Sequence, residues 1–133
     1  MNRPLPEIDP DSKPFWDGTA QSELRFQRCA DCHSAIFYPR NICPFCHSQQ
    51  LDWETSAGRG TVYSFTVARK PAGPAFADAV PMTIGLVDVE EGFRMMSNIL
   101  GDPDRVAIGA RVRVVFRPAG ENVVLPLFEL EQA

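Results

Sequence analysis

Four cysteines in two Cys-x-x-Cys pairs constrain the fold of this chain more than any other feature. Cys29-Ala-Asp-Cys32 and Cys43-Pro-Phe-Cys46 are separated by ten residues. Each pair can direct two thiolates at one point, and a hairpin between the pairs brings the four sulfur atoms together. Four thiolates in a tetrahedral arrangement suit Zn²⁺, with Fe as the alternative occupant. The spacing therefore predicts a metal site whose ligands are Cys29, Cys32, Cys43 and Cys46.

Two disulfides and a thioredoxin-like redox pair are the alternatives to this metal site. The chain begins without the apolar segment of a secretory signal, so we expect a cytoplasmic protein whose thiols stay reduced. A redox pair of that kind needs one Cys-x-x-Cys motif, whereas this chain has two. Four protein ligands leave no open position for water or substrate, which predicts a structural metal. No apolar run approaches the roughly 20 residues that span a bilayer.

A histidine follows the second cysteine of each pair, at His33 and His47. This position in a metal-binding loop often requires a positive φ, and histidine is among the residues that tolerate it. We therefore interpret both histidines as solvent-exposed loop residues. A ligand exchange with one cysteine and a general-base role are the alternatives.

The residues around the cysteine segment predict a short helix before it and a β-barrel after it. Asp11 or Ser12 can cap a helix that carries Phe15 and Trp16, with Pro14 in its first turn. From Gly58 onward the side chains alternate with the period of β-strands. Strand patterns cover residues 61–67, 82–86, 93–99, 111–117 and 123–130. Five short strands favour a small closed barrel of the OB type.

The alternation also predicts which side chains share a strand face. The aromatic residues on the apolar faces are expected in the core, and they are Tyr63, Phe65, Phe93 and Phe116. Met82, Ile84 and Leu86 share one face of the second strand, and Arg111, Arg113 and Arg117 point outward from the fourth. Pro126 places the last strand at an edge or a bulge. Glu90-Glu91-Gly92 is expected at a solvent-exposed hairpin tip.

Charge and motif content disfavour two broad classes of function. The formal net charge is -4, and four thiolates with one Zn²⁺ make it more negative. A negative net charge argues against sequence-independent binding of nucleic acid. None of the common nucleophile, phosphate-loop or metalloprotease motifs is present. An enzyme that works on its own is therefore disfavoured.

In order along the chain, these features resemble a family of acyl-CoA-associated proteins with an N-terminal helix, a rubredoxin-like zinc ribbon and a C-terminal OB-fold. The matching stretches are Pro14-Phe-Trp16, Cys29-x-x-Cys32, Tyr38-Pro-Arg40, Cys43-Pro-x-Cys46, Gly58-x-Gly60-Thr-Val-Tyr-Ser-Phe-Thr66, Pro81, Gly92 and Gly109-Ala-Arg-Val-Arg-Val. His33 and His47 depart from it, because the family often has glycine or a small polar residue there.

The resemblance implies a mainly β protein divided into an N-terminal tail and helix (1–24), a zinc ribbon (25–57) and a five-stranded OB-fold (58–133). It also implies a non-catalytic accessory subunit with structural zinc, which binds acyl-CoA and docks on a thiolase, a thiolase-like aldolase or an acyl-CoA hydratase in lipid, steroid or aromatic metabolism. Both homo- and hetero-oligomers are compatible with this role. A nucleic-acid-binding module is the alternative, since ribbons and OB-folds also bind nucleic acids.

A coenzyme A ligand requires cations for its phosphates and an apolar channel for its pantetheine and acyl groups. Arg69 and Lys70 precede a loop of Ala, Gly and Pro residues with Phe76 at its middle, and Arg40 lies beside the second cysteine pair. We expect Arg40, Arg69, Lys70 and Phe76 to contribute to ligand binding. The alternative for the cations is an ordinary solvated surface.

Overall fold

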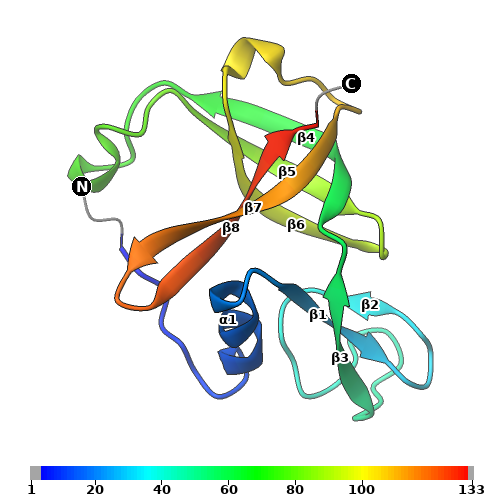
Figure 1. Cartoon of the computed structure of the whole chain (residues 1–133). Coiled ribbons are helices and arrows are strands. Elements are labelled where there is room, and N and C mark those ends of the chain that lie inside the picture. Colours follow the sequence, from blue (N-terminus) through cyan, green and yellow to red (C-terminus); the bar gives the residue numbers. More distant parts are fainter. Residues whose placement is uncertain (1–3, 132–133) are drawn as a thin grey trace.

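One short helix, a small three-stranded sheet and a closed barrel follow one another along the chain (Figure 1). This computed structural model describes residues 4–131. The elements are α1 (Lys13–Ala20), β1 (Leu24–Cys29), β2 (Ala35–Ile36), β3 (Leu51–Ser56), β4 (Arg59–Ala68), η1 (Pro74–Phe76), β5 (Met82–Val89), β6 (Phe93–Leu100), η2 (Pro103–Arg105), β7 (Arg111–Gly120) and β8 (Val123–Leu130). The predicted mainly β architecture is confirmed. No helix within residues 4–131 is long and apolar enough to span a membrane.

The three-stranded sheet carries the two cysteine loops. Its strand order is β2-β1-β3, and β1 pairs antiparallel with both neighbours. The first cysteine loop connects β1 to β2, and the second lies between β2 and β3. Because Cys29 pairs with Leu51 at the end of this sheet, the backbone on both sides of the cysteine loops is fixed.

The five predicted barrel strands close in the order β4-β5-β6-β8-β7. Antiparallel pairs make up most of the barrel, and the closure between β6 and β8 is parallel. That parallel contact is short, since it joins only Ile99 to Phe128 and Leu100 to Glu129. Pro126 lies on β8 beyond this contact, and its carbonyl accepts a hydrogen bond from the Ser97 hydroxyl at 2.8 Å. Backbone pairing between β6 and β8 therefore does not extend to Pro126, which agrees with the predicted edge or bulge position.

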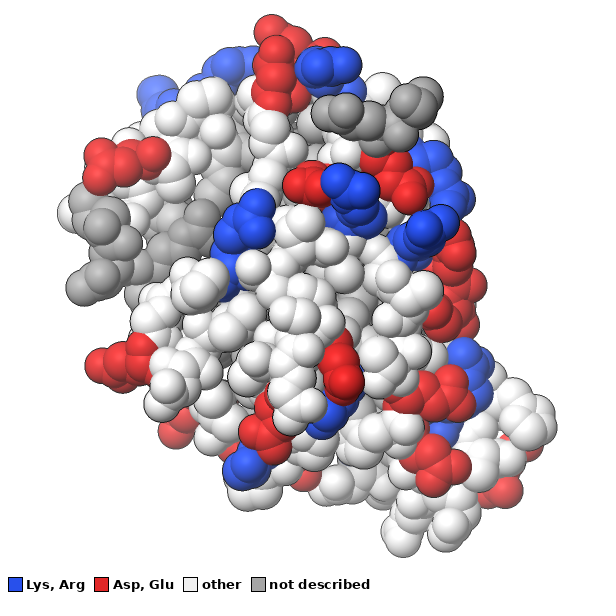
Figure 2. Space-filling model, viewed as in Figure 1, with Lys and Arg blue, Asp and Glu red and all other residues white. Residues whose placement is uncertain are grey.

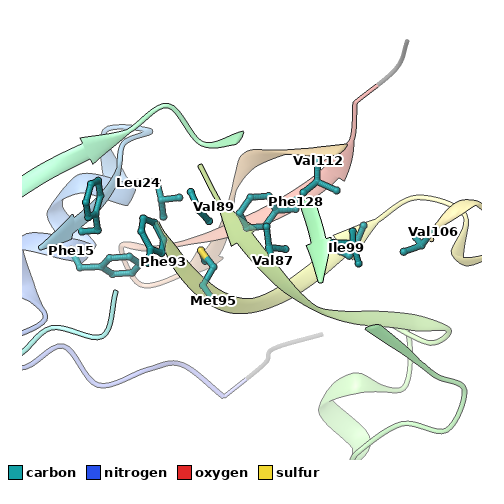
Figure 3. Close-up of a cluster of buried hydrophobic side chains, with 12 residues drawn as sticks. Phe15, Leu24, Val87, Val89, Phe93, Met95, Ile99, Val106, Val112 and Phe128 are labelled. Carbon is teal, nitrogen blue, oxygen red and sulfur yellow. The ribbon is translucent and has the colours of Figure 1, made fainter. Parts of the chain in front are cut away.

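Helix α1 lies between the ribbon sheet and the β7–β8 hairpin, with Ser12 as its N-cap residue (Figure 1). Phe15 is buried on its inner face and meets the Phe37 ring edge-on at 5.4 Å. The Phe37 ring stacks in turn on Phe93 of β6 at 5.3 Å, and Phe93 contacts Phe26 of β1. Helix, ribbon and barrel thus share one hydrophobic core (Figure 3). Each buried aromatic side chain stabilises this arrangement by roughly 1.5–3 kcal/mol.

Glu91 lies in the predicted hairpin turn, but it is half-buried rather than solvent-exposed and adds a polar connection between ribbon and barrel. Its half-buried carboxylate accepts hydrogen bonds from the Ser56 hydroxyl at 2.5 Å and from the Ala57 N–H at 2.9 Å. The Arg28 guanidinium donates to the Glu91 carbonyl at 3.3 Å. The β5–β6 turn therefore holds the segment that joins β3 to β4.

Tyr63 corrects one predicted core position. A β-bulge interrupts the register of β4 between Val62 and Ser64, so the alternation shifts by one residue. Val62 is buried, while Tyr63 is 49% exposed and lies under the Arg94 guanidinium at 3.4 Å. Phe65 and Phe116 pack against the core as half-buried residues, and Phe93 is buried, as predicted.

The face of β5 that carries Met82, Ile84 and Leu86 is the outer one. The inward positions of this strand are Thr83, Gly85, Val87 and Val89, and all four are buried. The outer face is half-exposed although it is apolar. Arg111, Arg113 and Arg117 of β7 point outward as predicted, and Val112 on the opposite face is fully buried.

Candidate functional site

The two cysteine loops have the same backbone hydrogen-bonding pattern. The His33 N–H donates to the Cys29 carbonyl, and the His47 N–H donates to the Cys43 carbonyl, both at 2.9 Å. Both histidines have a φ of 65° and are exposed, which confirms their interpretation as loop residues with positive φ. In each loop a backbone N–H also lies 3.4 Å from the sulfur of the first cysteine. These contacts direct both pairs of thiols toward the same point.

The four sulfur atoms lie within 4.8 Å of one another, and all four cysteines are free rather than disulfide-bonded. The Cys29 and Cys46 sulfurs are 3.5 Å apart, and those of Cys32 and Cys43 are 3.6 Å apart. A tetrahedral site with Zn–S bonds of 2.3 Å has sulfur–sulfur separations of about 3.8 Å. The ribbon therefore presents four cysteines positioned for a metal ion.

Neighbouring groups shift the pKa values of the thiols in opposite directions. The hydroxyl and backbone N–H of Ser34 lower the pKa of Cys32 to about 6. At Cys46 the Ser48 N–H acts in the same direction, but lost hydration and three neighbouring sulfurs outweigh it and raise the pKa to about 12. One thiolate forms readily, whereas four thiolates together require a cation. The donor set thus fits a divalent metal ion.

An apolar pocket opens beside the seam of the barrel and has a volume of about 510 Å³. Helix α1, the segment after β2, and strands β5, β6 and β8 form its walls. The lining residues are Ser12, Phe15, Trp16, Phe37, Tyr38, Pro39, Met82, Ile84, Met95, Met96, Ser97, Asn98, Leu125, Pro126 and Leu127. Sequence reasoning missed this pocket, although the apolar outer face of β5 was a signal for it.

Three of the four predicted ligand-binding residues are chain neighbours of a pocket-lining residue or of its strand partner. Arg40 directly follows Pro39 in the pocket wall, and hydrogen bonds to Gln27 hold the Arg40 backbone at 2.8 and 2.9 Å. Arg69 and Lys70 follow Ala68, whose strand partner is Met82 in the pocket wall. All three cations are exposed, and within residues 4–131 no carboxylate forms an ion pair with them. Phe76 is half-buried in η1 and does not line the pocket.

A second, polar cavity of about 750 Å³ lies beside η2 and the outer face of β7. Two of the four arginines that line it are paired with carboxylates. Arg113 contacts Glu129 at 2.6 Å, and Arg111 contacts Glu90 at 2.8 Å and Glu131 at 3.4 Å. Acidic and basic side chains are also interspersed over the face in Figure 2. The charges of Arg111 and Arg113 are thus compensated by neighbouring carboxylates.

The geometry and the family profiles agree on the class of protein, a zinc ribbon joined to an OB-fold. The profile described as "ChsH2, rubredoxin-like zinc ribbon domain" matches residues 16–52, and "ChsH2, C-terminal OB-fold domain" matches residues 53–117. The chain belongs to this ChsH2 family, which is the family that its motifs resemble. The two profiles meet within β3, and the division 1–24, 25–57 and 58–133 remains a prediction.

Curated relatives include subunits and scaffold proteins. The chain is 38% identical over 95% of its length to a probable enoyl-CoA hydratase alpha subunit of Thermomonospora curvata. It is 41% identical over 84% of its length to the 3-oxo-4,17-pregnadiene-20-carboxyl-CoA hydratase alpha subunit of Mycobacterium tuberculosis. The match spans only 39% and 35% of these two relatives. A DUF35 domain-containing scaffold protein of Methanothermobacter thermautotrophicus is 35% identical, with 74% of this chain and 75% of the relative covered.

Two solved structures share the fold. A chain of the Ltp2-ChsH2(DUF35) aldolase matches with a TM-score of 0.84 and 35% identity, over 95% of this chain and 98% of that chain. A DUF35-family protein of unknown function from Sulfolobus solfataricus matches with a TM-score of 0.67 and 16% identity, over 93% and 87% of the two chains. The second likeness concerns the fold alone.

Proposed function

We propose that this protein is a non-catalytic accessory subunit that binds an acyl-CoA thioester and docks on a cytoplasmic enzyme of acyl-CoA metabolism. The partner is a thiolase, a thiolase-like aldolase or an acyl-CoA hydratase, and it supplies the catalytic residues. The likeness to nearly the whole of a chain of the Ltp2-ChsH2(DUF35) aldolase carries this proposal. The relatives that are hydratase alpha subunits and scaffold proteins support it.

In this proposal the ribbon holds one structural Zn²⁺ through Cys29, Cys32, Cys43 and Cys46. The close approach of the four sulfurs supports this assignment. Zinc with four thiolate ligands has no free coordination position, so its role is to hold the two cysteine loops together. The ribbon then presents a fixed surface to the partner and to the apolar pocket.

The cations and the pocket support the coenzyme A part of the proposal. Arg69 and Lys70 lie next to the β5 end of the pocket, and Arg40 lies next to another part of its wall. Phosphate groups form strong charge-assisted hydrogen bonds with such cations, and an apolar pocket suits pantetheine and an acyl group. The formal net charge of -4 and the mixed charges on the face shown in Figure 2 favour this proposal over the nucleic-acid alternative, which requires a continuous basic surface.

Purification of the untagged protein with its natural partner tests the proposal. We expect a stable complex with an enzyme of acyl-CoA metabolism, and turnover of an acyl-CoA substrate by the complex. The isolated chain should give no thiolysis, retro-aldol cleavage or hydration. Robust turnover by the isolated chain would contradict the accessory role. Tight, salt-sensitive binding of single-stranded nucleic acid, without an acyl-CoA enzyme as partner, would favour the alternative function.

A further inference from the structure

The apolar pocket has a lining that restricts the chemistry of its occupant. Among residues 4–131 no charged side chain lines it, and its few polar groups are largely engaged within the protein. The Ser97 hydroxyl donates to the Pro126 carbonyl at 2.8 Å, and the Asn98 amide donates to the Thr83 carbonyl at 3.3 Å. A carboxylate placed in this pocket would lose hydration without gaining a cation. The pocket therefore disfavours charged groups.

The pocket can adjust to its occupant because three methionines line it. Met82, Met95 and Met96 contribute to the lining, and methionine is flexible and polarisable. Trp16 and Tyr38 provide broad aromatic surfaces on the opposite walls. Because β6 and β8 pair only at Ile99/Phe128 and Leu100/Glu129, the pocket reaches past the barrel surface to the buried Met95. An extended or ring-shaped hydrophobic group matches this shape.

We infer that the pocket binds the acyl group of the thioester and selects large, uncharged hydrophobic acyl groups over short or dicarboxylic ones. This inference rests on the proposed function, which leaves the acyl group undefined. A volume of about 510 Å³ lies within the usual range for small-molecule sites. Arg40 follows the lining residue Pro39, and Arg69 with Lys70 follows the strand partner of the lining residue Met82. Cations thus adjoin segments of an apolar pocket, as an ester with an anionic head group and an apolar tail requires.

Binding titrations with the full chain test this selectivity. The chain has two tryptophans, so a Trp53→Phe variant leaves Trp16 in the pocket as the only tryptophan fluorophore. The probes are free coenzyme A, hexanoyl-CoA, decanoyl-CoA and sebacoyl-CoA, the dicarboxylic match of decanoyl-CoA. We expect affinity to rise about two- to fourfold per added methylene group from hexanoyl to decanoyl. Decanoyl-CoA should shift the Trp16 emission, whereas sebacoyl-CoA should bind no better than coenzyme A.

A charge at the pocket mouth provides the second arm of the experiment. Met96 is 61% exposed and lines the pocket, so Met96→Lys introduces a cation without burying it in the core. Ile108 is 71% exposed and lies outside the pocket, which makes Ile108→Lys the matched control. We expect Met96→Lys to weaken decanoyl-CoA binding about tenfold and to leave the affinity for free coenzyme A unchanged. Ile108→Lys should bind both as the unmodified protein does.

The outcomes separate this inference from the proposed function. Equal affinity for coenzyme A and decanoyl-CoA, or an unchanged preference for decanoyl-CoA in Met96→Lys, would overturn the inference while coenzyme A binding stands. If no coenzyme A derivative binds, 1-decanol is titrated against the Trp53→Phe protein. A Trp16 emission shift that Met96→Lys reduces would then retain the hydrophobic pocket and reject the proposed ligand. Absence of that shift would reject both.

Discussion

At the scale of single residues, Gly58 sets the path between ribbon and barrel. Its φ is 77°, a left-handed conformation that glycine adopts more readily than other residues. Its N–H donates to the Ser56 hydroxyl at 2.9 Å, and its carbonyl accepts from the Val114 N–H at 2.7 Å. A Cβ at this position would overlap with Cγ1 of Val114. Both the backbone angle and the packing therefore require glycine.

We predict that Gly58→Ala lowers the free energy of unfolding by about 2–4 kcal/mol, from left-handed strain and crowding together. Gly73→Ala is the matched control, because Gly73 is extended and no atom lies within 4 Å of its added Cβ. Denaturant unfolding of both variants measures the difference. Equal stability of the two variants would show that the segment relaxes around the new methyl group.

Residue conformations that depend on the local loop were predictable from the sequence. Side-chain exposure that depends on pairing with a distant strand was not. The positive φ of His33 and His47 follows from the loop that a Cys-x-x-Cys pair forms, so the sequence signal lies within a few residues. Tyr63 was predicted in the core because the alternation of β4 looks regular. Its exposure results from a bulge in the pairing with β5, about 20 residues away, and no local signal marks it.

At the scale of elements, we expect the ribbon to depend on the proposed Zn²⁺ more than the barrel does. The ribbon's own core is small, with Cys29, Ile36 and Cys43 as its buried residues. The proposed Zn²⁺ would therefore replace much of the hydrophobic stabilisation that larger elements have. The barrel has a continuous core that includes Val62, Val87 and Phe128. Loss of the metal should affect the two parts unequally.

We predict one Zn²⁺ per chain in untagged protein, measured by elemental analysis. Removal with a strong chelator, or the Cys43→Ser substitution, should increase amide hydrogen exchange in residues 29–50 far more than in β5 and β6. Re-addition of Zn²⁺ should restore protection only in the unmodified chain. Metal-free protein with two disulfides after purification under reducing conditions would contradict the zinc assignment.

The existence of most strands was predictable from the sequence, whereas the pairing that closes the barrel was not. Alternation over residues 93–99 and 111–117 identified β6 and β7, because one face of each strand packs into the core. The short parallel contact between β6 and β8 depends on barrel closure, which strand periodicity does not encode. The seam beside it, and the pocket that α1 partly covers, follow from that closure. The pocket was therefore not predicted.

At the scale of the whole molecule, an acidic chain is proposed to bind an anionic ligand. The formal net charge is -4, so long-range attraction does not favour coenzyme A. Attraction must come from individual cations, and two of the four arginines that line the polar cavity are paired with carboxylates. Arg69 and Lys70 form no ion pair within residues 4–131 and adjoin the pocket wall at Met82. They are the strongest candidates for phosphate contacts.

We predict that Arg69→Ala/Lys70→Ala weakens coenzyme A ester binding tenfold or more without changing the unfolding midpoint. Each charge-assisted contact with a phosphate is worth on the order of 1.5–3 kcal/mol, and both side chains are exposed, so their removal leaves the core intact. Arg105→Ala/Arg117→Ala removes the same charge from the polar cavity and serves as the matched control. Calorimetric titration at two salt concentrations separates local contacts from net charge, because a net-charge effect would weaken both double variants equally. Wild-type affinity in Arg69→Ala/Lys70→Ala would exclude this pair from the proposed ligand site.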